Sequence, residues 1–294
     1  MSLNMSESRF VIFDLDGTLI DTIGDLGAAV EHALTEGGFP GHTTGEYRSM
    51  VGHGIRNLVT RALPEGASEE TIDATLKVFK EYYTTHIDVY SRPYPGIHGL
   101  LRFLTDDGVS ISVASNKFQE GTETLIRRFF PDIPFAAILG NAPGLPLKPD
   151  PEVVYKAIEI AGQSQLYAVA PPVQGRVHSR FAAAEYGLRT VAPPAAEAGS
   201  EPARPVPATI YPDSARSVGR RNRALPARNG FPKVSAVMVG DSATDIRTAR
   251  NAGIPAIGVS WGFRPRADLE IADAVADDVD ELRGLIISYI HDNK

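Results

Sequence analysis

The chain has 294 residues, a formal net charge of −7 and no cysteine. Its composition, 43% hydrophobic and 22% charged, is that of a globular protein large enough for one large domain or two smaller ones. The absence of cysteine excludes disulfides, thiolate zinc sites and a cysteine nucleophile. No apolar run approaches the about 18 residues that span a bilayer, and no signal peptide is recognisable. We therefore expect a cytoplasmic protein without membrane contact, and the acidic balance argues against a nucleic-acid partner.

Charge and proline are distributed unevenly along the chain. Residues 163–233 hold ten basic and four acidic residues, a net charge of +6, and ten of the 22 prolines, which leaves −13 on the rest. Because proline interrupts regular elements and alanine, proline, arginine and serine dominate the stretch, we expect this Pro/Arg-rich insertion to be largely disordered. Its basic residues between 216 and 228 could bind nucleic acid or an acidic partner, although such clusters are usually solvated surface.

The first predicted element is a buried strand over residues 9–13, a short apolar run rich in strand formers. It ends in an Asp-Leu-Asp-Gly-Thr run at 14–18. From residue 21 to about 90, apolar side chains recur at helical spacing, and turn-forming stretches at 37–40 and 63–66 divide the pattern into helices. Residues 21–92 are therefore expected to form a second, smaller helical domain inserted after the first strand.

The remaining sequence alternates between strand and helix patterns. The predicted strands are 110–114, 135–139, 236–239 and 254–260, and the predicted helices are 100–104, 118–130, 151–161, 243–252 and 280–290. Strands that alternate with helices form a parallel sheet covered on both faces. The predicted fold class is therefore α/β, with a parallel-sheet core built from residues 1–20, 93–162 and 234–294.

Polar residues stand at four places, three of which follow predicted strands and one of which, Lys148, precedes the predicted helix over 151–161. Asp14 and Asp16 follow the first strand, and in open parallel sheets the active site lies beyond the carboxyl ends of the strands. The other places, in chain order, are Ser115 with Asn116, Lys148, and Asp241 with Asp245. Singly, each has an ordinary structural explanation, because serine and aspartate cap helices and lysine is usually solvated. Four such places in this order together argue against an accident.

This set of motifs resembles the signature of the haloacid dehalogenase-like superfamily, which consists mostly of phosphatases. The resemblance covers residues 9–162 and 234–294. It implies a Rossmann-like core with residues 21–92 as an inserted α-helical cap. It also implies Mg²⁺-dependent hydrolysis of a small phosphorylated metabolite through an aspartyl-phosphate intermediate. Residues 51–58 resemble the Gly-x-Gly segment of phosphoglycolate phosphatase-like caps, which makes 2-phosphoglycolate a candidate substrate.

The resemblance implies a role for each motif. Asp14 is the expected nucleophile, and Asp16 is expected to protonate the leaving oxygen and then to activate the hydrolytic water. Aspartate at position 16 favours hydrolysis, because the dehalogenase branch lacks it. The groups expected to hold the phosphoryl oxygens are Ser115, Lys148, Asn116 and the backbone around Thr18.

Four carboxylates in one pocket would repel a phosphate dianion, so a cation is expected. Oxygen ligands of this kind suit Mg²⁺. The resemblance implies that Asp14 and Asp241 bind the ion through their side chains and Asp16 through its backbone carbonyl. Asp245 is expected to act through water or through Lys148.

The predicted cap offers three candidate substrate contacts, Gly52, His53 and Arg56. Glycine allows a ligand to approach the backbone closely, and the arginine or the histidine could meet a substrate carboxylate. The ordinary alternative is the start of a helix with solvated histidine and arginine side chains.

Two other functions stay open. A phosphosugar mutase of the same superfamily would share both catalytic aspartates, but it would need a sugar-bisphosphate activator, and no cap feature resembles the mutases. A catalytically impaired binding or interaction protein would result if the insertion displaced the strand before Asp241. We expect a variant without residues 163–233 to keep its Mg²⁺-dependent phosphatase activity, because loop closure costs little extra with length.

Overall fold

The computed structural model describes residues 8–169 and 234–291. Most of the predicted insertion, with its expected disorder and its basic cluster, lies outside these described residues. Helix α7 (Glu152–Val169) continues past residue 161, where the sequence pattern placed its end, into the start of the predicted insertion. None of the described helices is both long and apolar enough to cross a bilayer.

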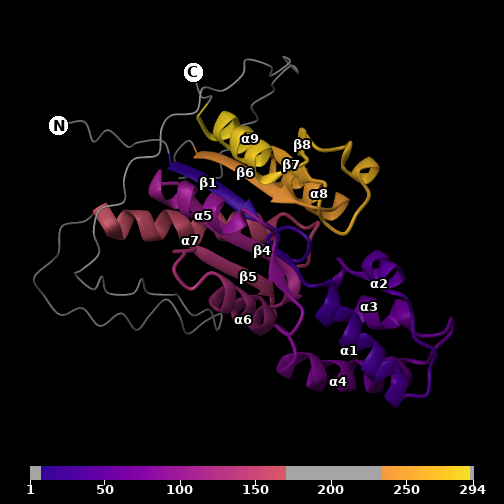
Figure 1. Ribbon diagram of the computed structural model, residues 1–294. Helices are drawn as coiled ribbons and strands as arrows, with labels where there is room; N and C mark the ends of the chain where they lie inside the picture. Colours follow the sequence, from indigo (N-terminus) through magenta and orange to yellow (C-terminus); the bar gives the residue numbers. More distant parts are fainter. Residues whose placement is uncertain (1–7, 170–233, 292–294) are drawn as a thin grey trace, which may run out of the picture.

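Among the described residues, the core is a six-stranded parallel sheet in the order β5-β4-β1-β6-β7-β8 (Figure 1). Its strands are β1 (Ser8–Phe13), β4 (Ser110–Phe118), β5 (Ala137–Asn141), β6 (Val234–Gly240), β7 (Ala256–Val259) and β8 (Ala274–Ala276). Strand β1 lies between β4 and β6, where both of its faces are covered. The predicted α/β class with a parallel-sheet core is confirmed.

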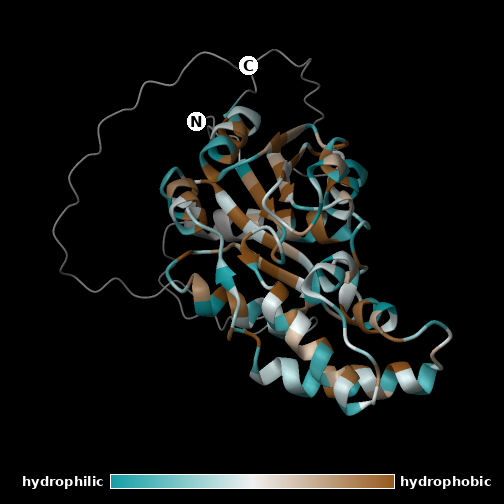
Figure 2. Cartoon of the chain, turned by 45° about the vertical axis from the view of Figure 1, so that its right-hand side comes forward, coloured by the Kyte–Doolittle hydropathy of each residue, from teal (hydrophilic) through white to brown (hydrophobic). Residues whose placement is uncertain are grey.

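The side chains of β1 alternate between two apolar layers. Phe10 and Ile12 pack with α7 and α8, whereas Val11 and Phe13 pack with α5, α6 and α9. The helices on the two faces, apart from α7, are α5 (Ile97–Asp106), α6 (Gln119–Phe129), α8 (Ala243–Ala252) and α9 (Val279–His291). Figure 2 shows hydrophobic strands enclosed by helices with hydrophilic outer sides. Each large apolar side chain buried in this way contributes about 1.5–3 kcal/mol.

Helices α1–α4 form a separate group beside the carboxyl edge of the sheet (Figure 1). They are α1 (Ile23–Glu36), α2 (Thr44–Met50), α3 (Gly54–Ala62) and α4 (Glu69–Thr85). Local sequence sets two of their starts: Thr43 and Glu46 form a capping box before α2, and Ser68 accepts the N–H of Thr71 at 3.2 Å before α4. A short antiparallel ribbon, β2 (Ile20–Asp21) with β3 (Arg92–Pro93), joins the group to the core.

Some boundaries differ from the sequence-based predictions for local reasons. The strand predicted to end at 114 continues to Phe118, through polar residues that an apolar pattern does not mark. The short strands β2, β3 and β8 are not predicted, because two or three residues carry no alternating pattern. The helical pattern is also interrupted between α2 and α3, where Gly52 adopts a φ of +114°.

Candidate active site

Strands β1, β4 and β6 end at the same edge of the sheet. Phe13 is in register with Val113 of β4 and with Val239 of β6. The strand order also reverses at β1, and such a switch point leaves a crevice in an open α/β sheet. The predicted site residues that emerge together just beyond this register are Asp14, Ser115 and Asp241.

The loop after β1 folds back tightly on itself. The N–H groups of residues 18–20 all donate to the carbonyl of Leu15, at 3.0 to 3.2 Å. Gly17 adopts a left-handed φ of +86°, and a Cβ at this position would clash with the carboxylate of Asp241. Glycine therefore allows the loops that carry the first and last predicted motifs to approach each other.

Lys148 lies buried between two carboxylates. Its Nζ is 2.6 Å from Oδ1 of Asp14 and 2.6 Å from Oδ1 of Asp245. Burial alone would lower the pKa of Lys148, but the two carboxylates outweigh this effect and raise its pKa. Lys148 is therefore a fixed positive charge beside Asp14 at neutral pH.

Asp14, Asp241 and Asp245 form a buried carboxylate cluster, in which one oxygen from each residue lies within 4.8 Å of the others. Burial, opposed by Lys148, raises the pKa of Asp14 to about 7. Burial, and then the charges of Asp245 and Asp14, raise the pKa of Asp241 well above its ordinary value. The positive charge of Lys148 alone thus does not balance the negative charge of the three carboxylates. A divalent cation that prefers oxygen ligands fits it.

Two backbone segments anchor the carboxylate cluster. Oδ2 of Asp241 accepts the N–H of Phe263 at 2.6 Å. Oδ2 of Asp245 accepts the N–H and the hydroxyl of Ser242 at 3.1 and 2.6 Å, which completes a capping box at the start of α8. One oxygen of Asp245 therefore caps the helix, while the other contacts Lys148.

Asp16 is held by two side chains that are not among the predicted site residues. Its Oδ1 accepts the hydroxyl of Thr22 at 2.7 Å and lies 3.2 Å from Nζ of Lys117. Lys117 is buried and also donates to the hydroxyl of Tyr83 in α4 at 2.6 Å. It therefore links Asp16 to the helical group. Its place directly after the Ser115-Asn116 motif is the sequence signal that could have revealed it.

Ser115 and Asn116 lie at the irregular end of β4, where the register with β5 shifts. Oγ of Ser115 accepts the N–H of Lys117 at 3.2 Å, which leaves the hydroxyl hydrogen to donate to a ligand. The Asn116 amide donates to the carbonyls of Gly52 and Lys148 at 3.1 and 3.2 Å, and its oxygen accepts the N–H of Lys148 at 2.8 Å. The Asn116 side chain therefore joins the backbone at Lys148 to the backbone at Gly52 in the helical group.

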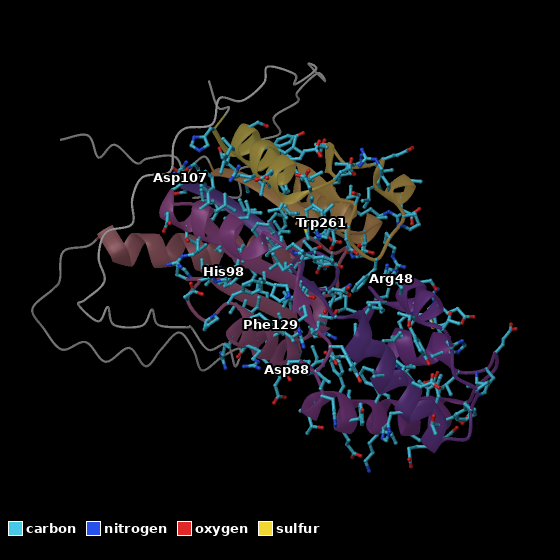
Figure 3. The ribbon with its side chains drawn as sticks, in the orientation of Figure 1. Arg48, Asp88, His98, Asp107, Phe129 and Trp261 are labelled. Carbon is cyan, nitrogen blue, oxygen red and sulfur yellow. The ribbon has the colours of Figure 1, made fainter. Side chains whose placement is uncertain are left out.

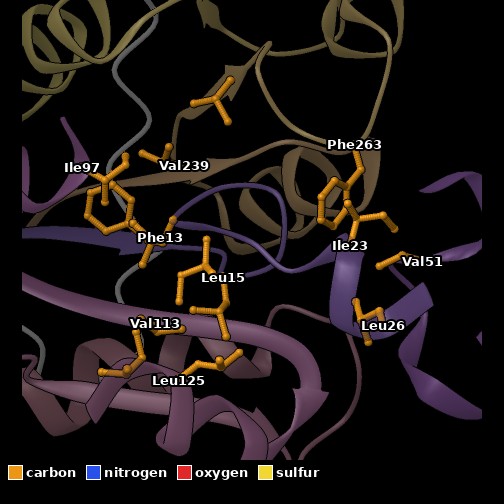
Figure 4. Close-up of a cluster of buried hydrophobic side chains, with 14 of the residues drawn as sticks. Phe13, Leu15, Ile23, Leu26, Val51, Ile97, Val113, Leu125, Val239 and Phe263 are labelled. Carbon is orange, nitrogen blue, oxygen red and sulfur yellow. The ribbon is translucent and has the colours of Figure 1, made fainter. Parts of the chain in front are cut away.

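These residues line an open cavity between the sheet edge and the helical group. The helical group contributes Leu26, Val51, Gly52, Gly54, Ile55 and Leu58 to its lining. None of these has a polar side chain. Figure 4 shows that Phe263 from the core lies beside Ile23 of α1, so an apolar contact joins the two parts next to the cavity.

Three predicted substrate contacts are not brought to this cavity. Thr18 is fully buried, and its backbone N–H, the expected donor, is hydrogen-bonded to the carbonyl of Leu15 at 3.2 Å. His53 precedes α3 and is exposed. Arg56 is exposed on the helical group, where it pairs with Asp73 at 2.5 Å and also with Glu69.

Arg264, in the loop after β7, is a further lining residue that the motifs do not mark. Its Nη1 donates to the carbonyls of Arg48 and Ser49 at 3.1 and 2.9 Å, and its Nη2 donates to the carbonyl of Val51. Figure 3 shows Arg48 where the helical group faces the core, and its guanidinium carbon lies 5.9 Å from the centre of the Phe263 ring. An isolated arginine in a loop has no motif that could have revealed it.

The chain is similar to known proteins over most of its length. It matches the family model described as haloacid dehalogenase-like hydrolase over residues 11–169 and a HAD-hydrolase-like model over residues 218–282. The first match contains Asp14, Asp16, Ser115 and Lys148, and the second contains Asp241 and Asp245.

Relatives and solved structures agree with these matches. The chain is 28% identical over 261 residues to the phosphoglycolate phosphatase of Mesorhizobium japonicum, covering 87% of this chain and 84% of that protein. It is 33% identical over 155 residues to the phosphoglycolate phosphatase of Aquifex aeolicus, covering 53% and 71% respectively. The crystal structure of a predicted phosphoglycolate phosphatase from Haemophilus somnus has the same fold, with a TM-score of 0.65 at 20% identity over 96% of this chain and 99% of that one.

Proposed function

We propose a reaction for this chain, which belongs to the haloacid dehalogenase-like hydrolase family and is a phosphatase. The proposed reaction is Mg²⁺-dependent hydrolysis of a small phosphate monoester through an aspartyl-phosphate intermediate. The observation that carries it is the 2.6 Å contact between Asp14 and Lys148 in a cavity that Asp16 also lines. An anionic nucleophile needs a fixed cation beside it to approach a phosphate dianion, and Lys148 supplies that charge.

Two aspartates divide the proposed chemistry. In the first step, a carboxylate oxygen of Asp14 bonds to phosphorus, the bond to the ester oxygen breaks, and Asp16 gives its proton to that oxygen. In the second step, Asp16 takes a proton from a water molecule whose oxygen bonds to phosphorus. The bond to Asp14 then breaks and inorganic phosphate leaves. Thr22 and Lys117 both donate to Asp16, and so they hold its carboxyl group in place between the steps.

The carboxylate cluster and its neighbours supply suitable ligands for Mg²⁺. Asp14 and Asp241 would hold the ion through side-chain oxygens and Asp16 through its backbone carbonyl, while Asp245 would act through Lys148, which it contacts. When bound, the ion neutralises the carboxylates and polarises the phosphate oxygens. Ser115 and Lys148 would donate to those oxygens.

We propose that helices α1–α4 form a cap, which covers the cavity and excludes water during the reaction. Their apolar lining favours a small phosphorylated metabolite. 2-Phosphoglycolate is the first candidate, because the similar proteins from Mesorhizobium japonicum and Aquifex aeolicus are named for this substrate. The cytoplasmic location expected from the sequence stays a prediction.

A panel of phosphate monoesters, assayed with and without Mg²⁺, tests this function. We expect phosphate release with Mg²⁺, loss of release with a chelator, and the highest kcat/KM for 2-phosphoglycolate. Release without any sugar-bisphosphate activator would argue against the mutase alternative. A folded protein that releases no phosphate from any compound would contradict the proposal and favour the impaired binding protein.

A further inference from the structure

Arg264 belongs to the core and reaches the cap. Its backbone lies one residue after Phe263, whose N–H holds the Asp241 carboxylate at 2.6 Å. Its guanidinium donates to three backbone carbonyls within residues 48–51, at the C-terminal end of α2. This end of a helix attracts cations because its last carbonyls lack donors within the helix. Arg264 therefore extends from the carboxylate cluster to the cap.

Arg264 also differs from the other cations of the cavity. Among the described lining residues these cations are Lys117, which is 3.2 Å from Asp16, and Lys148, which is 2.6 Å from Asp14. Within the described part of the chain, the hydrogen bonds of Arg264 go to neutral carbonyls, and no carboxylate pairs with it. A guanidinium has more N–H donors than these three bonds use. Arg264 thus keeps both charge and donors for an anion.

We propose that Arg264 determines specificity by binding the carboxylate of a short phosphorylated acid whose phosphate lies at Asp14, an assignment that rests on the proposed phosphatase function. A guanidinium offers parallel N–H groups that match a carboxylate. The apolar side chains of the cap wall, such as Val51 and Leu58, offer no hydrogen bonds to the hydroxyls of a sugar. A short acid needs none, because its two charged ends meet Lys148 and Arg264.

Gly52 of the cap lies next to this guanidinium. It lies in the loop between α2 and α3 with a φ of +114°, and a Cβ there would be 3.3 Å from Nη2 of Arg264. A side chain at position 52 would strain the backbone, and the guanidinium would have to shift by a few tenths of an ångström. Glycine at position 52, which the sequence singles out as a candidate substrate contact, is thus explained by its backbone conformation and by the nearby Arg264.

The test compares two substrates of similar size, 2-phosphoglycolate and 2-hydroxyethyl phosphate, which lacks the carboxylate. We expect Arg264→Gln to lower kcat/KM for 2-phosphoglycolate by about 10- to 100-fold, mainly through KM, since a hydrogen-bonded charge is lost. The value for 2-hydroxyethyl phosphate should change less than about 3-fold. Arg264→Lys, which keeps the charge without the planar fork, should fall between Arg264→Gln and the wild type.

A matched control variant distinguishes a role of Arg264 in substrate binding from a role in holding the cap in place. Arg61 donates to the same Ser49 carbonyl at 2.9 Å but does not line the cavity, so Arg61→Gln should leave the ratio of the two kcat/KM values unchanged. An equal loss on both substrates in Arg264→Gln, or an unchanged ratio in Arg264→Lys if the glutamine variant fails to fold, would overturn the proposal. A wild-type protein that hydrolyses neither compound with Mg²⁺ would instead contradict the phosphatase function.

Discussion

The two walls of the cavity differ in kind. The core wall carries buried charged side chains that contact one another, as in the 2.6 Å contacts of Lys148 with Asp14 and Asp245. The cap wall presents apolar side chains and backbone. Core residues follow strands, so the sheet register fixes their positions, whereas the cap residues depend on how helices pack. In the proposed reaction, the groups that make and break bonds belong to the core, and the groups that exclude water and select substrates belong to the cap. Lys117, Asn116 and Arg264 extend from the core to the cap.

The largest effect should come from the core wall. Asp14→Asn removes the proposed nucleophile but keeps the side-chain volume, so we expect turnover to fall by at least about 10³-fold. The fold should persist, because the change removes one charge from a crowded carboxylate cluster. Turnover of a generic phosphate monoester and circular dichroism measure the two outcomes.

Asp73→Asn is the matched control for this substitution. Asp73 pairs with Arg56 on the exposed side of the cap, so the same chemical change there should leave turnover near that of the wild type. Near-normal turnover in Asp14→Asn would remove Asp14 as the nucleophile and, with it, the proposed division between the walls.

Lys148→Met should have the next largest effect. It removes the cation between Asp14 and Asp245, so we expect turnover to fall by about 10²- to 10³-fold. Without Mg²⁺, the free energy of unfolding should fall by about 3–5 kcal/mol, because two buried carboxylates lose their partner. Denaturant titration measures the free energy of unfolding, and Lys77→Met, at an exposed lysine, is the control. Unchanged stability would show that the two carboxylates do not depend on Lys148.

The core wall could largely be predicted from the sequence, and the cap wall could not. The apolar run before Asp14 and the strand before Asp241 define a register, so their meeting follows from parallel pairing. Arg264 could not be predicted, because its position depends on how a core loop packs against α2. Arg56 illustrates the same limit: its neighbour Ile55 lines the cavity, and successive helix residues point about 100° apart, so Arg56 faces away.

The carboxylate cluster on the core wall also predicts that the affinity for Mg²⁺ depends on pH. The pKa of Asp14 is raised from 3.8 to about 7 in the protein without metal, and Mg²⁺ must displace that proton. We expect Mg²⁺ to bind about tenfold more weakly at pH 6 than at pH 8. Calorimetric titration in two buffers of different ionisation enthalpy should show that Mg²⁺ binding releases more protons at pH 6 than at pH 8. Affinity that does not change with pH would contradict this, and Asp14→Asn is the control.

The raised pKa of Asp14 also predicts how the free energy of unfolding changes with pH when Mg²⁺ is absent. Between pH of about 4 and 7, the folded protein keeps a proton on Asp14 that the unfolded chain has lost. The free energy of unfolding contributed by this group is therefore largest at low pH and falls as the pH rises toward 7. Denaturant titrations across this range, with and without saturating Mg²⁺, should show the decline only without the ion.

The smallest effect should come from the exposed side of the cap, at Arg56. The sequence makes it a candidate for binding a substrate carboxylate, but its guanidinium contacts Asp73 and Glu69 away from the cavity. Exposed ion pairs contribute little, because water and salt screen them. Arg56→Gln should therefore change KM for 2-phosphoglycolate less than about 2-fold, while Arg264→Gln raises it strongly. The opposite order would assign carboxylate binding to the cap itself, through a movement of α3 that brings Arg56 to the cavity.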